Sequence, residues 1–233
     1  QRAQENGDTH LVAELDEAYE YMGIDTCAVD SMCLTACPVG IDTGKFIKKL
    51  RHENAGAAEE KVWSTAAKNW QVTSRGAATA LTGAHMLPAQ LVTKVTDVGR
   101  SLIGPDTVPG YQPELGKGGK SRERLAGRVG DRYAETSGIY LPACVNSMFA
   151  PQGEGMGATE AFITVLERAG IALEVPKGIE KLCCGTPWSS KGMRKGHDIM
   201  EQRVRETVME ATDNACLPVI VDASSCTAGF QEM

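Results

Sequence analysis

The chain has 233 residues, of which 42% are hydrophobic and 23% are charged, and its formal net charge at pH 7 is −6. This composition is typical of a globular protein with room for one large or two ordinary domains. The acidic balance argues against nucleic acid as a partner, because a phosphate-binding protein needs a basic face. No apolar run approaches the roughly 20 residues that span a bilayer.

The N-terminus and the cysteines narrow the class of protein further. Residues 1–8 are polar and lack the apolar core of a signal peptide, so we expect the chain to begin inside a longer protein. Clustered cysteines without a secretion signal predict metal binding or redox chemistry in the reducing cytoplasm, rather than a disulfide framework. The eight cysteines are Cys27, Cys33, Cys37, Cys144, Cys183, Cys184, Cys216 and Cys226.

The first region, residues 1–54, predicts a small helical segment of the ferredoxin type, with two helices around a cysteine loop. Apolar residues at helical spacing over 11–22 predict the first helix, with Asp8 or Thr9 as its N-cap. After the loop, Thr43 is expected to cap the second helix.

The second region, residues 55–135, predicts Ala-rich helices followed by a linker. Pro88 is expected to kink or break the helical stretch, and the Gly- and Pro-rich run 104–119 predicts an exposed linker. We interpret the basic residues that follow as a solvated face. These are Lys117, Lys120, Arg122, Arg124 and Arg128.

An apolar stripe at steps of three or four runs through this helical region. We expect it to pack against the flanking domains, and the alternative is a peripheral contact with a membrane surface. The stripe consists of Leu81, Ala84, Leu91, Val95, Val98 and Leu102.

The third region, residues 136–233, alternates strands with helices, which predicts a doubly wound parallel sheet. The whole chain is therefore expected to be of the α plus α/β class, with this last domain truncated. The strands are expected at 138–141, 171–175 and 217–222, and the helices at 158–169 and 196–212.

The first cysteine site lies in the run CAVDSMCLTACP, which begins at Cys27. It nearly matches the bacterial ferredoxin run C-x2-C-x2-C-x3-C-P, so we expect Cys27, Cys33 and Cys37 to ligate a [4Fe–4S] cluster. Asp30 stands in place of the second cysteine, either as an oxygen ligand or as a turn residue. Pro38 can end the loop because it has no main-chain N–H that would need a hydrogen-bond partner. A tetrahedral zinc site is the alternative.

Paired ferredoxin motifs exchange ligands, because the fourth cysteine of one run binds the cluster held mainly by the other. Cys37 would then serve a cluster whose other ligands lie outside this chain. We therefore expect neither cluster of the pair to be complete in these 233 residues.

The second cysteine site draws on three separate loops. Cys144 follows the first predicted strand, Cys183 and Cys184 follow the second, and Cys226 follows the third. The carboxyl ends of parallel strands share one edge of a sheet, so we expect these four thiols to form one metal or redox site. Cys216 precedes the third strand, which predicts a structural core residue at the opposite end.

No catalytic residue is assigned. The glycines at 153–157 are spaced G-x-G-x-G, not as a dinucleotide-binding loop, and we defend no Ser–His–Asp or paired-carboxylate set.

Four runs around these cysteines resemble the C-terminal part of large bacterial FAD-linked D-2-hydroxyacid dehydrogenases of the D-lactate and D-2-hydroxyglutarate types. The Cys-Cys-Gly site is shared more widely, with the iron–sulfur subunits of glycolate oxidase, anaerobic glycerol-3-phosphate dehydrogenase and heterodisulfide reductase. The runs are GIDTCAVDSMCLTACPVGIDTGKFIKKLR (23–51), YLPACVNSMFAPQGEG (140–155), EKLCCGTPWSSKG (180–192) and VIVDASSCTAG (219–229).

The resemblance implies an oxidoreductase whose FAD domain lies upstream in the same polypeptide. It also implies an upstream ferredoxin run and a second Cys-Cys motif beyond Met233. Electrons would pass from flavin through [4Fe–4S] clusters to a quinone or another acceptor, in the cytoplasm or at the inner face of the membrane. The alternatives are an iron–sulfur module of the related complexes and a structural zinc module.

We expect this chain alone to be inactive on hydroxyacids, because substrate contacts lie outside it. The resembling family usually carries Cys-Ala-x-Asp-Gly-x-Cys, so Asp30 is a family feature and Ser31 is a departure from it.

Overall fold

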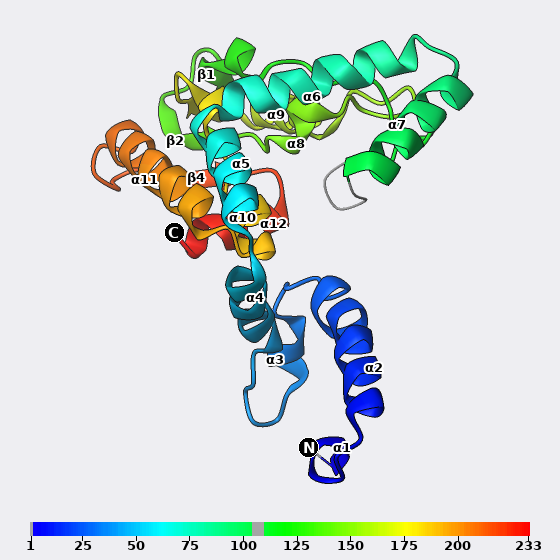
Figure 1. Cartoon of the computed structure of the whole chain (residues 1–233). Coiled ribbons are helices and arrows are strands. Elements are labelled where there is room, and N and C mark those ends of the chain that lie inside the picture. Colours follow the sequence, from blue (N-terminus) through cyan, green and yellow to red (C-terminus); the bar gives the residue numbers. More distant parts are fainter. Residues whose placement is uncertain (1, 104–109) are drawn as a thin grey trace. The chain divides into compact units, whose positions relative to one another are not determined.

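The computed structural model describes residues 2–103 and 110–233 (Figure 1). The chain divides into two compact units. The first combines Gln1–Thr65 with Gly185–Asp198, and the second combines Ala66–Cys184 with Ile199–Met233. The predicted division into three domains, 1–54, 55–135 and 136–233, remains a prediction. None of the described helices is both long enough and apolar enough to cross a membrane.

The first unit consists of helices around the first cysteine loop. Its elements are α1 (Arg2–Glu5), α2 (Thr9–Tyr19), the π-helix η1 (Glu20–Asp25), α3 (Met32–Ala36), α4 (Thr43–Asn54), the start of α5 (Ala57–Lys68), α10 (Thr186–Lys191) and the start of α11 (Arg194–Ala211). A small apolar cluster of Ile24, Val29 and Ile47 holds the loop against α4, with Cys27 and Leu50 packed on it.

The N-caps of α2 and α4 can be compared with the N-caps predicted from the sequence. Asp8 caps α2, since its carboxylate accepts from the Leu11 N–H at 3.0 Å. The expectation for α4 was wrong by one residue: Asp42 is the cap, and it accepts from the Lys45 N–H at 3.2 Å. A carboxylate is a stronger acceptor for the free N–H groups of a first turn than the Thr43 hydroxyl.

The helical middle of the chain continues with α6 (Trp70–His85) and α7 (Ala89–Ile103), which are separated at Pro88 as predicted. The expected packing of the apolar stripe was wrong for α7. Leu91 and Leu102 are 51% and 79% exposed, and Val95 and Val98 are exposed as well.

The linker prediction was only partly correct. Residues 104–109 lie outside the described residues, and 110–119 contain no helix or strand. Gly119 is nevertheless buried, and a Cβ on Gly118 would lie 1.9 Å from the carbonyl oxygen of Ala78 in α6. The end of the predicted linker is thus packed tightly against a helix.

The second unit contains a four-stranded sheet with the order β1-β3-β2-β4. Strand β2 pairs in parallel with both β3 and β4, as expected, whereas β1 pairs antiparallel with β3 and makes the sheet mixed. The α plus α/β class is confirmed. The strands are β1 (Gly127–Gly130), β2 (Thr136–Leu141), β3 (Ala172–Val175) and β4 (Val219–Val221).

Helices and short turns complete this unit, and α9 lies beside the sheet in Figure 1. They are η2 (Arg122–Leu125), α8 (Val145–Met148), α9 (Ala158–Ala169), η3 (Ile179–Lys181), most of α11 and α12 (Ser224–Gln231). Helix α9 matches its predicted range and stops at Gly170, which has the left-handed φ of 66° that glycine tolerates. The core of the unit includes the fully buried Tyr140, Val175 and Met200.

Candidate metal centre

Four thiols meet where the parallel strands end. Cys144 caps α8 directly after β2, Cys183 and Cys184 follow η3, and Cys226 lies in α12 after β4. The sulfur atoms of Cys144 and Cys183 are 3.6 Å apart. Side-chain hydrogen bonds join Cys183 to Cys184 and Cys184 to Cys226. The predicted convergence of the four thiols is therefore confirmed, and metal ligation by them remains a prediction.

The four thiols are largely shielded from water and differ in their acidity. Cys183, Cys184 and Cys226 are buried. The Cys183 thiol lowers the pKa of Cys144 by a hydrogen bond, and the positive charge of Arg122 acts in the same direction. The pKa of Cys183 is raised well above its usual range by its hydrogen bonds to Cys144 and Cys184 and by burial. A hydrogen bond with Cys184, together with burial, also raises the pKa of Cys226.

Arg122 ties two of the cysteine loops together. Its guanidinium donates to the carbonyl oxygen of Pro142 at 2.6 Å and to that of Leu182 at 3.0 Å. These carbonyls lie two residues before Cys144 and one residue before Cys183. Because Arg122 is only 4% exposed, its interpretation as part of a solvated face was wrong.

Not every donor of Arg122 has a hydrogen-bond partner among the described residues. Its main-chain N–H donates to the Glu180 carboxylate at 2.5 Å, but its Nε has no partner among the described residues. Glu180 is fully buried, and its Oε2 also lacks a partner there. A guanidinium stays charged when buried, so it favours negative charge on the adjacent sulfur atoms.

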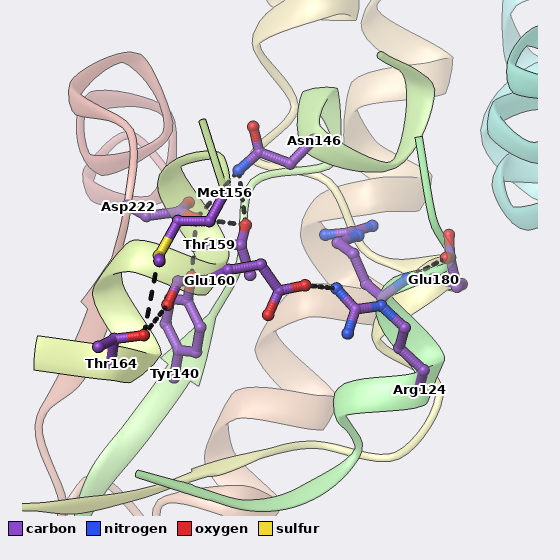
Figure 2. Close-up of polar contacts among 10 residues, drawn as sticks. Arg124, Tyr140, Asn146, Met156, Thr159, Glu160, Thr164, Glu180 and Asp222 are labelled. Atoms are coloured by element: carbon purple, nitrogen blue, oxygen red, sulfur yellow. Dashed lines mark hydrogen bonds and ion pairs between the residues drawn. The ribbon is translucent and has the colours of Figure 1, made fainter. Parts of the chain in front are cut away.

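Asp222 is the second group that positions the site (Figure 2). Its Oδ1 accepts from the Ala143 N–H at 2.7 Å, next to Cys144. Its Oδ2 accepts from the hydroxyl of Tyr140 at 2.7 Å and from the side chain of Asn146 at 3.0 Å. One carboxylate at the end of β4 thus holds strand β2 and the Cys144 loop.

The same network reaches α9 through Thr159. The Thr159 hydroxyl donates to Asp222 at 3.2 Å and accepts from Asn146 at 2.9 Å (Figure 2). Burial, together with the adjacent Asp222 carboxylate, raises the pKa of Tyr140 far above its usual range, so its hydroxyl stays a donor. The sheet, the cysteine loop and α9 are therefore fixed relative to one another.

The donor set is suited to a soft metal, since thiolates select zinc, copper(I) and iron–sulfur clusters. Four sulfurs at about 2.3 Å from one tetrahedral zinc would lie about 3.8 Å apart. Within the described residues, no three of these sulfurs lie within 4.8 Å of one another. The 3.6 Å between the Cys144 and Cys183 sulfurs is close to this zinc spacing, and the four-thiol donor set fits an iron–sulfur cluster as well as zinc.

Cys216 does not belong to this group. It lies in the turn after α11, before β4, as the sequence predicted, but its side chain is exposed. The expectation of a core residue was wrong, because α11 ends in a turn with three residues of positive φ, Asp213–Ala215, that carries Cys216 to the surface.

The first cysteine site has a different construction. The Cys33 sulfur lies 2.8 Å from the Thr43 hydroxyl, and this hydrogen bond, with one from the Gly44 N–H, lowers the pKa of Cys33. Hydrogen bonds from the main-chain N–H groups of Ile41 and Val39 lower the pKa of Cys37. Both sulfur atoms are thus prepared to carry negative charge by hydrogen bonds from the Thr43 hydroxyl and from the surrounding backbone.

Pro38 supplies the turn that brings these donors to Cys37. The Gly40 N–H donates to the carbonyl oxygen of Cys37 at 3.1 Å, so Pro38 occupies the second position of a four-residue turn, where its fixed φ is favoured. Pro38 acts through the backbone, and contact with a cofactor stays a prediction.

Asp30 and Ser31 shape the loop. One Asp30 oxygen accepts from the Met32 N–H at 3.1 Å, which is the turn role, and iron ligation by Asp30 remains a prediction. Ser31 has a left-handed φ of 59°, where glycine is favoured, and its hydroxyl donates to Asp42 at 2.9 Å. Cys27 is half-buried against the apolar cluster of Ile24, Val29 and Ile47, apart from the backbone donors that serve Cys33 and Cys37.

Comparison with known families finds a match around the second site. A family model described as "CCG: Cysteine-rich domain" matches residues 139–231, which include Cys144, Cys183, Cys184 and Cys226. No curated protein and no solved structure matches the chain. The chain thus contains a CCG cysteine-rich domain, which fits an iron–sulfur region and a general role in electron transfer.

Proposed function

We propose that this chain is the electron-transfer region of an FAD-linked D-2-hydroxyacid dehydrogenase of the D-lactate or D-2-hydroxyglutarate type. The observation that carries the proposal is the meeting of four thiols from three loops within a CCG cysteine-rich domain. The finer assignment of enzyme, flavin and acceptor is supported by the resemblance of the four cysteine-containing runs.

In this proposal, Cys144, Cys183, Cys184 and Cys226 hold an iron–sulfur cluster, which supplies one-electron transfer when bound. The protein's share is to bind, orient and tune that centre. Burial of the sulfurs limits water access, and Arg122 favours the more negatively charged, reduced state. Asp222 keeps the Cys144 loop in place at the end of the sheet.

The first site would hold a second centre through Cys33 and Cys37, together with Cys27. The hydrogen bonds that the Thr43 hydroxyl and the backbone donate to the Cys33 and Cys37 sulfurs support this role, because donors to cluster sulfurs are one means by which proteins tune reduction potential. Electrons from a flavin would then pass by way of one centre to the other and on to a quinone or another acceptor.

Anaerobic incubation of the purified chain with ferrous iron, sulfide and a thiol reductant tests the proposal. We expect a broad visible absorption that decreases on reduction with dithionite, and no turnover of D-lactate or D-2-hydroxyglutarate with an artificial acceptor. Tight binding of one colourless zinc ion, without any iron–sulfur absorption, would contradict the electron-transfer function.

A further inference from the structure

A cavity of about 210 Å³ in the first unit is strongly basic. It lies between α4 and the segment from α10 to the start of α11. Among the described residues, its lining contains six basic side chains and no acidic one. The six are Lys45, Lys48, Lys49, His52, Arg194 and His197.

The basic residues come from two helix faces. Lys45, Lys48, Lys49 and His52 follow the spacing i, i+3, i+4 and i+7, so they share one face of α4. Arg194 and His197 share the first turn of α11 in the same way. Like charges at these spacings repel one another, so a bound anion would relieve the repulsion among Lys45, Lys48 and Lys49 of α4. The concentration of positive charge is local, since the chain as a whole carries −6.

Contacts within the unit fix the two walls of the cavity. The His52 Nδ1 lies 2.9 Å from the carbonyl oxygen of Gly192, and the Arg51 guanidinium donates to the carbonyl oxygen of Ser190 at 2.6 Å. A Cβ on Gly192 would lie 2.5 Å from the main-chain nitrogen of His52, and Gly192 has a φ of 76°. Only glycine permits this approach, so the cavity is formed in advance of any ligand.

The floor of the cavity is apolar and rigid. Trp188 is fully buried and donates through Nε1 to the carbonyl oxygen of Trp63 at 2.9 Å, and Met193 is buried beside it. A low-dielectric floor strengthens the attraction between the basic side chains and an anion. The volume is below the roughly 300–1,000 Å³ of pockets for drug-sized ligands, which limits the occupant to a small molecule.

Acidic groups lie near the rim, and the carboxylates of Asp198 and Glu201 lie within 4.8 Å of a His197 ring nitrogen, whereas two others compensate little of the lysine charge. Lys49 pairs with Glu53 at 3.8 Å, but the two side chains are 65% and 53% exposed, and such a pair contributes little. Asp42 acts on Lys45 electrostatically, while its carboxylate is already engaged in capping α4.

We propose that this cavity binds a small oxyanion with two or more negative charges, either a phosphate or a short polycarboxylate. Lysine, arginine and histidine donors match that chemistry, because charge-assisted hydrogen bonds to such oxygens are the strong ones. The site is distinct from both cysteine sites and does not depend on the proposed electron-transfer function.

Isothermal titration of the full chain with inorganic phosphate and with citrate, at pH 7, tests the proposal. We expect saturable 1:1 binding of at least one of the two anions, accompanied by a change in tryptophan fluorescence from Trp188. The anion that binds more tightly shows whether the cavity prefers a phosphate or a polycarboxylate. Sodium chloride at matched ionic strength should leave the fluorescence unchanged, and an equal response to chloride would overturn the proposal.

Variants locate the binding. Lys45→Glu with Arg194→Glu should weaken the affinity at least tenfold, whereas Lys61→Glu, an exposed residue of α5 outside the lining, should change it less than twofold. If the double variant fails to fold by circular dichroism, a perturbation of the His52 ring resonances by the anion in the unaltered chain replaces it. Equal affinity in the two variants, or no perturbation at His52, would refute the site.

Discussion

The two cysteine sites of this chain are built in opposite ways. In the first, Cys33 is exposed and Cys37 is half-buried, and hydrogen bonds from the Thr43 hydroxyl and from main-chain N–H groups of residues 39–44 lower their pKa. In the second, Cys183 and Cys226 are buried, and their pKa is raised because their protons are held between sulfur atoms. A local turn therefore prepares the first site, whereas the second depends on the tertiary structure of the sheet.

This difference indicates which substitutions should disrupt each site. Changes far along the sequence from the second site should damage it, because Arg122 and Asp222 hold its loops from other elements. The first site should respond to changes within its own loop and in α4, whose Ile47 and Arg51 also contact that loop.

Removing the Asp222 carboxylate should have the largest effect. Asp222→Ala leaves the Tyr140 hydroxyl and the Ala143 N–H without their acceptor, so we expect a loss of about 3–4 kcal/mol in the free energy of unfolding. Urea unfolding followed by circular dichroism measures it. Asp97→Ala, at an exposed position of α7, is the control and should change stability by less than about 0.5 kcal/mol. Similar small losses in both variants would show that the network is not needed to hold the site.

Arg122→Met should rank second, with a loss of about 2 kcal/mol. The carbonyl oxygens of Pro142 and Leu182 lose their donor, although removing a buried charge offsets part of the cost. Arg124→Met is a matched control: Arg124 pairs with Glu160 at the surface, and losing that pair should cost less than about 0.5 kcal/mol. The same urea titrations would contradict the account if the two arginine variants were equally stable.

A smaller effect concerns the pH dependence of the metal-free chain. The pKa values of Cys183 and Cys226 are raised in the folded state, so their contribution to stability is complete below the ordinary thiol pKa of 9.0 and is lost as the pH rises beyond it. We therefore expect the unaltered chain to lose stability relative to the double variant Cys183→Ala with Cys226→Ala as the pH rises from 8 to 10.

Cys33 and Cys37 should behave in the opposite sense, since their lowered pKa favours the thiolate at a lower pH. Alkylation of the native metal-free chain with iodoacetamide, read by peptide mass spectrometry, should label them several-fold faster than Cys183 and Cys226. Equal rates at all four positions would remove the contrast between the sites.

Ser31→Gly should have the smallest effect. Glycine relieves the left-handed strain of Ser31 but removes the hydrogen bond to Asp42, and both terms are about 1 kcal/mol. We expect the free energy of unfolding to change by less than about 0.5 kcal/mol. A loss above about 2 kcal/mol would mean that the Ser31 hydroxyl is essential to this loop.

The sequence predicted the parts of the fold that depend on local patterns. The range of α9, its end at Gly170 and the break at Pro88 follow from periodicity and from the backbone preferences of single residues. The placement of four thiols at one sheet edge follows from the order of strands and helices. Strand β1 escaped prediction because its four residues, GRVG, carry no alternating pattern.

The residues that position the second site could not be recognised locally. Arg122 belongs to a run of basic residues that look alike in sequence, and only the folded chain shows that it is buried while Arg124 is not. For Asp222, an acidic residue at the end of an apolar strand was the available signal. The exposure of Cys216 depends on a turn with three residues of positive φ, and no pattern in the sequence predicts such a turn.

The most direct test of the central claim is the iron and sulfide content of the reconstituted chain and of three serine variants. We predict that Cys183→Ser and Cys226→Ser lose the cluster of the second site, whereas Cys216→Ser, at an exposed cysteine outside the site, retains it. Unchanged iron content in Cys183→Ser and Cys226→Ser, or a loss confined to Cys216→Ser, would contradict the assignment of the four thiols to one iron–sulfur centre.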